Sequence, residues 1–210
     1  SGGERGHGDR AEGDSVPYRY MFTGMATGAV VHTLTIEWDT TKGGKHALDY
    51  LTTFNRTVNA NPCAGVTGCN EATFDTEPIP ADEQVTDAGV TPIAGAFRLY
   101  GGNITSVSPY GYSHGAGFDG DKSASITISF TTTVANPVLA WGGHIATRPD
   151  WGETNSAVAI DGSPYHMRLI GVDNDVVDPN DNGPGGNQDR SLSADAVIFP
   201  ASITIIKDTV

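Results

Sequence analysis

The stretch Val30–Trp38, with the sequence VVHTLTIEW, decides the fold class. Apolar side chains and His32 occupy its even-numbered positions, and threonine or glutamate occupies most of its odd-numbered ones. Successive side chains of a strand point to opposite faces, so this alternation is typical of a half-buried antiparallel strand. A second stretch, Ala124–Val134 (ASITISFTTTV), alternates in the same way. Both stretches predict long strands with one face in the core.

Shorter segments with β-forming residues lie between clusters of glycine, proline, asparagine and aspartate. They are Tyr18–Thr23, His46–Phe54, Ala96–Tyr100, Ile104–Ser108, Pro137–Trp141, Ala157–Ile160, Tyr165–Gly171, Ala196–Phe199 and Ser202–Ile206. Many short strands separated by turns predict an all-β fold, namely a two-sheet antiparallel sandwich, jelly-roll-like, with long loops and extended termini. The segment HALDYLTTF also fits a short helix, because its apolar positions match neither period.

The composition narrows the classes of partner. The 210 residues include 27 glycines and 12 prolines, which disfavours long helices. There are 12 Lys and Arg against 25 Asp and Glu, so the net charge of −13 argues against a nucleic-acid partner, which needs clustered cations. No apolar run approaches the roughly 18 residues that a membrane span needs.

The chain divides into three regions by composition. Residues 1–15 (SGGERGHGDRAEGDS) are rich in glycine and charge and lack large apolar groups, which predicts an extended tail. Residues 16–201 hold the strand signals of a single sandwich domain, with a long acidic stretch of little periodicity at residues 59–91. Residues 202–210 form a C-terminal strand that could be exchanged with a neighbouring subunit.

Cys63 and Cys69 lie in the turn-rich segment NPCAGVTGCN, with five residues between them. A spacer of this length allows the Cα separation of roughly 4.4 to 6.8 Å that a disulfide needs, which predicts a small disulfide loop and an oxidising compartment. The alternative is a pair of free thiols in a cytosolic protein. Asn55 and Asn103 each begin a glycosylation sequon, NRT and NIT.

A calcium site is predicted near the C-terminus, in the sequence DPNDNGPGGNQD. Its ligands would be side-chain oxygens and one main-chain carbonyl, from Asp178, Asn180, Asn182, Pro184 (carbonyl) and Asp189. This spacing follows the acidic calcium loop up to its last position, where aspartate replaces the usual glutamate. The alternative is an acidic loop of Asx-turns without metal.

Other residue types that carry chemistry give weaker patterns. His144 and His166 lie in segments that could approach in space, but no short metal-ligand spacing is present, and His32 fits a hydrogen-bonded core histidine. The aromatic, glycine-rich segments Tyr110–Asp121 and Trp141–Gly152 could present rings to sugars, although packing at the ends of a sandwich explains them better. These patterns do not indicate an enzyme.

Two resemblances add expectations. The segment SITIIKDTV resembles the opening strand of prealbumin-like modules, the collagen-adhesin B-type domains of bacterial surface proteins. The body of the chain is similar to uncharacterised secreted bacterial surface proteins. That similarity lies in HALDYLTTFNRT, NPCAGVTGC, LAWGGHIA with DWG, GSPYHMRL and GGNQDRSLSADAVIFP. It implies secretion, a location outside the cell or on its surface, and no established catalysis.

The function that we expect is that of a non-catalytic structural subunit of an extracellular fibre or surface layer. Copies of the chain would assemble into a homopolymer when a terminal segment adds to an open sheet edge of a neighbour. The alternative is a calcium-stabilised carbohydrate-binding or adhesive module of a secreted surface protein, with glycans as partners. A secreted hydrolase is a third possibility.

Overall fold

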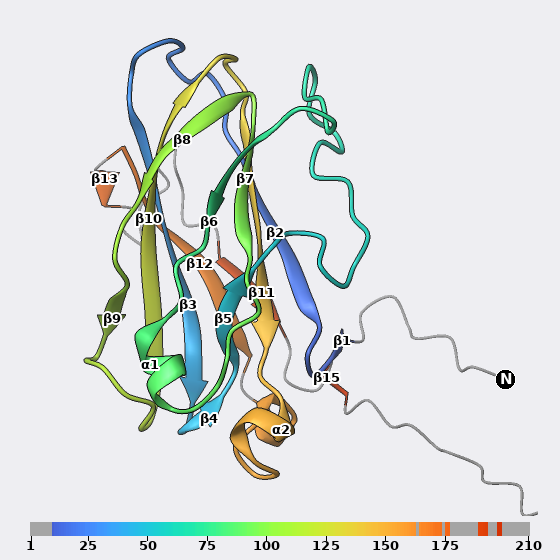
Figure 1. The fold of residues 1–210 in the computed structure, drawn as a ribbon, viewed down its shortest axis with the longest axis vertical. Coiled ribbons are helices and arrows are strands. Elements are labelled where there is room, and N and C mark those ends of the chain that lie inside the picture. Colours follow the sequence, from blue (N-terminus) through green and yellow to red (C-terminus); the bar gives the residue numbers. More distant parts are fainter. Residues whose placement is uncertain (1–9, 163, 174, 177–188, 193–196, 199–210) are drawn as a thin grey trace, which may run out of the picture.

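The computed structural model describes residues 10–162, 164–173, 175–176, 189–192 and 197–198. Two antiparallel sheets pack face to face in these residues (Figure 1), which confirms the predicted all-β sandwich. The chain changes sheet repeatedly, for example from β2 to β3 and from β10 to β11 to β12. Among the described residues, neither helix has the length or apolar sequence that a membrane span requires.

The larger sheet has the strand order β13-β12-β3-β10-β8. These strands are β13 (Asp175–Val176), β12 (Tyr165–Val172), β3 (His32–Lys42), β10 (Lys122–Thr132) and β8 (Gly102–Val107). Three further strands pair at its margins, namely β14 (Asp189–Leu192) with β12, β4 (Lys45–His46) with β3 and β9 (Gly111–Ser113) with β10.

The smaller sheet has the strand order β2-β11-β7-β6, and β5 pairs with β11. These strands are β2 (Ser15–Met21), β11 (Val138–Ile145), β7 (Ala96–Tyr100), β6 (Asp75–Pro78) and β5 (Leu48–Thr52). A separate parallel pair joins β1 (Arg10–Ala11) to β15 (Val197–Ile198). The helical elements are short: α1 (Glu83–Asp87), α2 (Arg148–Trp151) and the 3-10 turn η1 (Ala157–Ala159).

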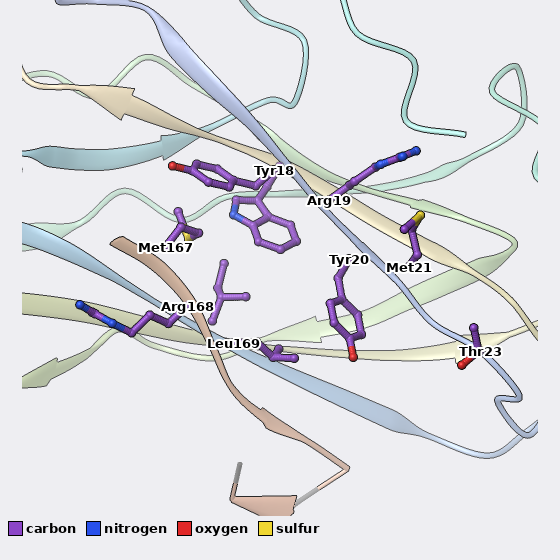
Figure 2. Close-up of a pocket in the computed structure, with 10 residues that line it drawn as sticks. Tyr18, Arg19, Tyr20, Met21, Thr23, Met167, Arg168 and Leu169 are labelled. Carbon is purple, nitrogen blue, oxygen red and sulfur yellow. The ribbon is translucent and has the colours of Figure 1, made fainter. Parts of the chain in front are cut away.

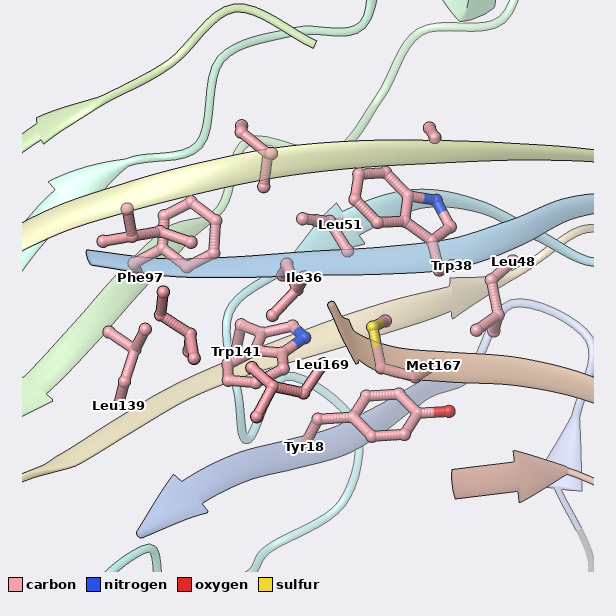
Figure 3. Packing of buried hydrophobic residues seen from close by; sticks show 14 of the residues in the cluster. Tyr18, Ile36, Trp38, Leu48, Leu51, Phe97, Leu139, Trp141, Met167 and Leu169 are labelled. Atoms are coloured by element: carbon pink, nitrogen blue, oxygen red, sulfur yellow. The ribbon is translucent and has the colours of Figure 1, made fainter. Parts of the chain in front are cut away.

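The register of β3 and β10 explains why the alternation in their sequences matters. Ile36 lies opposite Ile126, and Leu34 lies opposite Ile128, so the buried residues of both strands share one face. This face packs on the smaller sheet and forms the main core (Figure 3), in which Trp141 lies beside Ile36 and Leu169. The prediction of a half-buried strand is therefore correct for both stretches.

Strand β11 is buried along its whole length, because both of its faces are covered. Its inner face contributes Leu139 and Trp141 to the main core, whereas Val138 and Ala140 pack in a second cluster with the cysteine loop. The fit is close at Gly142, where an added Cβ would lie 2.5 Å from the hydroxyl oxygen of Thr52. Only glycine fits there without displacing β5.

Several predicted boundaries are wrong. Val30 and Val31 are exposed, so the first long strand begins at His32. The expected tail of residues 1–15 is too long, because Ala11, Glu12 and Ser15 are buried against the domain.

Two segments have a different secondary structure from the predicted one. The predicted strand at residues 157–160 is the 3-10 turn η1 (Ala157–Ala159) followed by its C-cap Ile160, and Ala157 and Ile160 are both buried. The stretch 59–91 contains β6 and α1. The helical alternative for HALDYLTTF is also wrong, since Leu48–Thr52 is a strand.

Candidate functional site

The two long sides of the sandwich differ. On one side the edge strands β6 and β8 are joined, since the amide of Ile104 donates to the carboxylate of Asp75 at 2.8 Å. On the other side, the smaller sheet ends at β2 and the larger sheet continues past β12 to β13 and β14. Among the described strands, β2 pairs with β11 alone. Its second edge therefore carries no strand from the described part of the chain.

A groove of about 280 Å³ runs beside this open edge, between β2 and β12. Figure 2 shows Tyr20 reaching from β2 toward Leu169 of β12, with Arg19 and Met21 directed to the opposite side of the strand. The lining residues are Tyr18, Arg19, Tyr20, Met21, Thr23, Ile36, Trp141, Met167, Arg168 and Leu169. Most of these side chains are apolar or aromatic.

The walls of the groove are firmly held. The Arg168 guanidinium donates to both carboxylate oxygens of the buried Asp39, at 2.6 and 3.1 Å, so its charge is neutralised within the sheet. Tyr18 stacks on Trp141, with ring centroids 6.4 Å apart and an interplanar angle of 21°. The buried indole N–H of Trp141 has no hydrogen-bond partner among the described residues. The β11 wall of the groove therefore contains one buried hydrogen-bond donor that has no acceptor among the described residues.

The main chain of β2 presents hydrogen-bonding groups along its open edge. The amide of Phe22, just after the strand, donates inward to the carbonyl of Pro137 at 3.0 Å. Alternate residues of an antiparallel strand direct both main-chain groups to the same side, so Pro17, Arg19 and Met21 direct theirs outward. Proline at such a position removes no bond from the existing ladder, which is typical of an edge strand.

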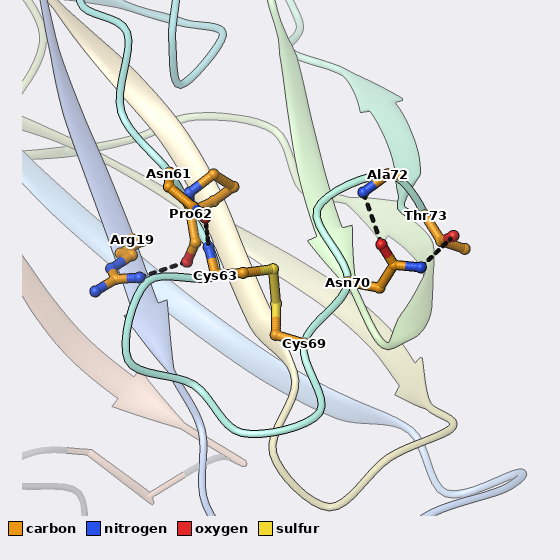
Figure 4. Close-up of a disulfide and its surroundings, with 8 residues drawn as sticks. All are labelled: Arg19, Asn61, Pro62, Cys63, Cys69, Asn70, Ala72 and Thr73. Carbon is orange, nitrogen blue, oxygen red and sulfur yellow. Dashed lines mark hydrogen bonds between the residues drawn. A yellow bond between two sulfur atoms is a disulfide. The ribbon is translucent and has the colours of Figure 1, made fainter.

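The cysteine loop fixes the outer face of β2 (Figure 4). Cys63 and Cys69 form the predicted disulfide, with a Cα separation of 5.4 Å. The guanidinium of Arg19 donates to the carbonyl of Pro62 at 2.5 Å. At the start of β2, the amide of Ser15 donates to the Thr57 hydroxyl at 2.8 Å. The loop therefore holds β2 while its edge from Pro17 to Met21 stays open.

Exposed apolar side chains gather at the end of the sandwich where β2 finishes. Met21 is 49% exposed, and Val30 and Val31, just before β3, are 47% and 59% exposed. Val134, just after β10, is 38% exposed. Because β3 starts opposite the end of β10, these residues share one end of the molecule with the mouth of the groove. This end is therefore suited to contact with another protein surface.

A buried polar cluster lies elsewhere, behind β5 and β11. The carboxylate of Asp49 accepts from His144 Nδ1 at 2.7 Å and from Trp151 Nε1 at 2.9 Å, and Tyr50 stacks on His144 with centroids 4.2 Å apart. An aspartate–histidine pair also occurs in nucleophilic catalysis. Here both side chains are almost completely buried, at 0% and 3% exposure, so no substrate can reach the ring. The cluster attaches α2 to the sheet.

The aromatic segments that could have bound sugars pack against each other. Trp151 stacks on His46, with centroids 3.4 Å apart, and Phe118 contacts both rings. Burial lowers the pKa of His46 to about 4, so its ring is neutral in this stack at pH 7. The segment Trp141–Gly152 is not a loop, since it contains the end of β11 and the helix α2. Packing therefore accounts for these rings, as the sequence favoured.

The predicted metal sites have different outcomes. His144 lies in the smaller sheet and His166 in the larger one, and the described residues contain no group of three or more histidine, cysteine or acidic side chains that could hold a metal. Four of the predicted calcium ligands, Asp178, Asn180, Asn182 and Pro184, lie outside the described residues. Asp189 is the first residue of β14, and its backbone lies opposite Arg168 of β12 in the strand register. The calcium site remains a prediction.

The remaining predicted residues are placed as follows. Asn55 and Asn103 are both exposed, and the side-chain oxygen of Asn55 accepts from Arg98 at 3.0 Å. His32 is a hydrogen-bonded core histidine, as expected: its Nε2 lies 2.8 Å from the carbonyl oxygen of Ala26 and its Nδ1 lies 2.8 Å from Asp173.

Sequence reasoning missed the open edge of β2, for which Pro17 is the one local signal. No family model, curated protein or solved structure matches the chain.

Proposed function

We propose that the chain is a non-catalytic structural subunit of an extracellular fibre or surface layer, and that copies of it polymerise when a terminal segment of one adds as a strand to the next. The observation that carries this proposal is the edge of β2, which pairs with no second described strand, beside a groove of mixed polar and aromatic lining. Unpaired main-chain groups along an exposed edge are a template for an additional strand. The apolar and aromatic side chains of the lining would bury alternate side chains of that strand.

The apolar end of the sandwich supports the same proposal. The exposed side chains of Met21, Val30 and Val31, near the end of β2, offer an apolar surface that the domain of the donating copy can contact. Contact between different surfaces of identical subunits propagates when the rotation between them does not close a ring. A linear polymer is the expected product.

The disulfide supports an extracellular location. Cys63 and Cys69 are bonded, and disulfides persist in oxidising compartments. The loop that they close also holds β2 through the contact between Arg19 and Pro62. An oxidised chain would therefore keep the edge of β2 in place after secretion.

The test is the size of the full oxidised chain in solution. We expect analytical ultracentrifugation to show a series of polymers that grows with protein concentration, and negative-stain images to show filaments or sheets. A chain that remains a monomer at all concentrations, with or without calcium, would refute the proposal.

A further inference from the structure

We infer that the segment Ser202–Ile206 of one copy occupies the groove along β2 of the next copy, with Ile203 and Ile205 facing the groove. This inference depends on the proposed function and names its two contact surfaces. The acceptor is the edge from Pro17 to Met21, and the donor is the SITII sequence near the C-terminus, which lies outside the described residues.

The two termini differ in their suitability as donors. Residues 1–9 read SGGERGHGD and contain no apolar side chain, so they have nothing to bury in the groove. The segment Ser202–Ile206 contains three isoleucines and a threonine, which favour extended backbone. The C-terminal segment is therefore the donor.

The length and alternation of this segment match the acceptor. Ser202–Ile206 has as many residues as the open stretch Pro17–Met21. Successive side chains of a strand alternate between faces, so Ile203 and Ile205 share one face while Ser202, Thr204 and Ile206 share the other. The face of Ile203 and Ile205 suits the half-buried ring of Tyr20, which reaches into the groove, and the more polar face is directed outward.

The strand orders show that there is room for an added strand. β2 and β12 lie on opposite sides of the groove. In the larger sheet, β14 pairs with the outer edge of β12. The smaller sheet has no described strand at the corresponding position. A donor strand beside β2 would fill that position and would be covered by the larger sheet on its apolar face.

The test uses two full-length variants, each damaged on one surface. The donor variant carries Ile203→Asp and Ile205→Asp, which places charges against the groove. The acceptor variant carries Arg19→Pro, which removes an outward amide and no ladder bond to β11. Arg19→Ala is its matched control, since it also loses the contact with Pro62 but keeps the amide. Thr204→Asp, on the outward face, is the control for the donor.

We expect each damaged variant alone to lose polymer at least about tenfold, because an unpaired or clashing strand group weakens each contact by this order. An equimolar mixture of the two should give dimers that do not grow, since one intact donor meets one intact acceptor. Thr204→Asp should polymerise like the parent, and Arg19→Ala should retain far more polymer than Arg19→Pro, because it keeps the outward amide. All variants should melt within a few degrees of the parent. If Arg19→Pro does not, Met21→Pro replaces it on the same open edge.

Competition gives a second readout on the unmodified chain. A synthetic peptide of residues 201–210 should shorten parent polymers, and the same peptide with both aspartates should not. If the parent polymerises and both damaged variants do so equally, or if their mixture stays monomeric, the inference is wrong and the proposed function survives through another contact. If the parent never polymerises, the proposed function itself fails.

Discussion

Replacing Asp49 by alanine should destabilise the domain strongly, although Asp49 lies far from the groove. Its carboxylate accepts hydrogen bonds from both His144 and Trp151. Alanine leaves both donors without this partner, and the imidazole N–H of His144 then lies where water is excluded. A buried donor that loses its partner costs about 1–3 kcal/mol.

The burial of each donor decides how much of this cost its loss carries. The side chains of Asp49 and His144 are 0% and 3% exposed, so the imidazole N–H cannot regain a hydrogen bond from water and its loss lies near the upper limit. The ring of Trp151 is partly exposed, so its N–H can be rehydrated and its loss lies near the lower limit. The two losses sum to about 4 kcal/mol. Asp49→Asn should cost less, because its remaining oxygen can still accept from one donor.

Urea denaturation followed by far-UV circular dichroism measures the difference. Asp161→Ala is the control, because Asp161 is 99% exposed and its replacement should change the free energy of unfolding by less than about 0.5 kcal/mol. The slope of the free energy against urea concentration should stay constant across the series. A loss below about 1 kcal/mol for Asp49→Ala would refute the assignment of this cluster as a structural anchor.

Three further predictions concern the cysteine loop, pH and calcium. Replacing Cys63 and Cys69 by serine should lower the free energy of unfolding by at most about 2 kcal/mol, because the loop that the disulfide closes is short. A larger loss, measured by calorimetry, would contradict this expectation. Stability should fall as pH is lowered from about 6.5 to 4, since the unfolded state protonates His46 in that window while the folded state does not; the drop should shrink in His46→Phe. Adding calcium to the chelated full-length chain should raise its melting temperature, and Asp178→Ala should abolish the rise; equal melting curves with and without calcium would exclude a structural site.

The long strands could be predicted because their burial is one-sided. In β3 and β10 one face meets the core and the other meets solvent, so the sequence alternates and the period of two is visible. In β11 both faces are covered, and the sequence VLAWGGHI contains no alternation. The prediction for this strand ended at Trp141 for that reason, although the strand continues to Ile145.

The groove could not be predicted because an edge is a property of strand order. β2 pairs with β11, and Tyr18 lies opposite Trp141, more than a hundred positions away in the sequence. No local pattern specifies such a pairing or shows that the second side of β2 remains open. The disulfide, in contrast, was predictable because its two residues lie close together in one turn-rich loop.

An open edge is a liability that folded proteins usually protect, so the protection present on β2 restricts what can bind. The N-terminal end of the strand is covered, because the amide of Ser15 donates to the hydroxyl of Thr57. Pro17 offers a carbonyl but no amide to a neighbour, which ends any regular ladder at that position. The full pairing capacity is left to Arg19 and Met21, and an added strand must align its own amides and carbonyls with these two residues. The edge is therefore suited to a short segment in a fixed register and poorly suited to the long, register-tolerant pairing that leads to aggregation.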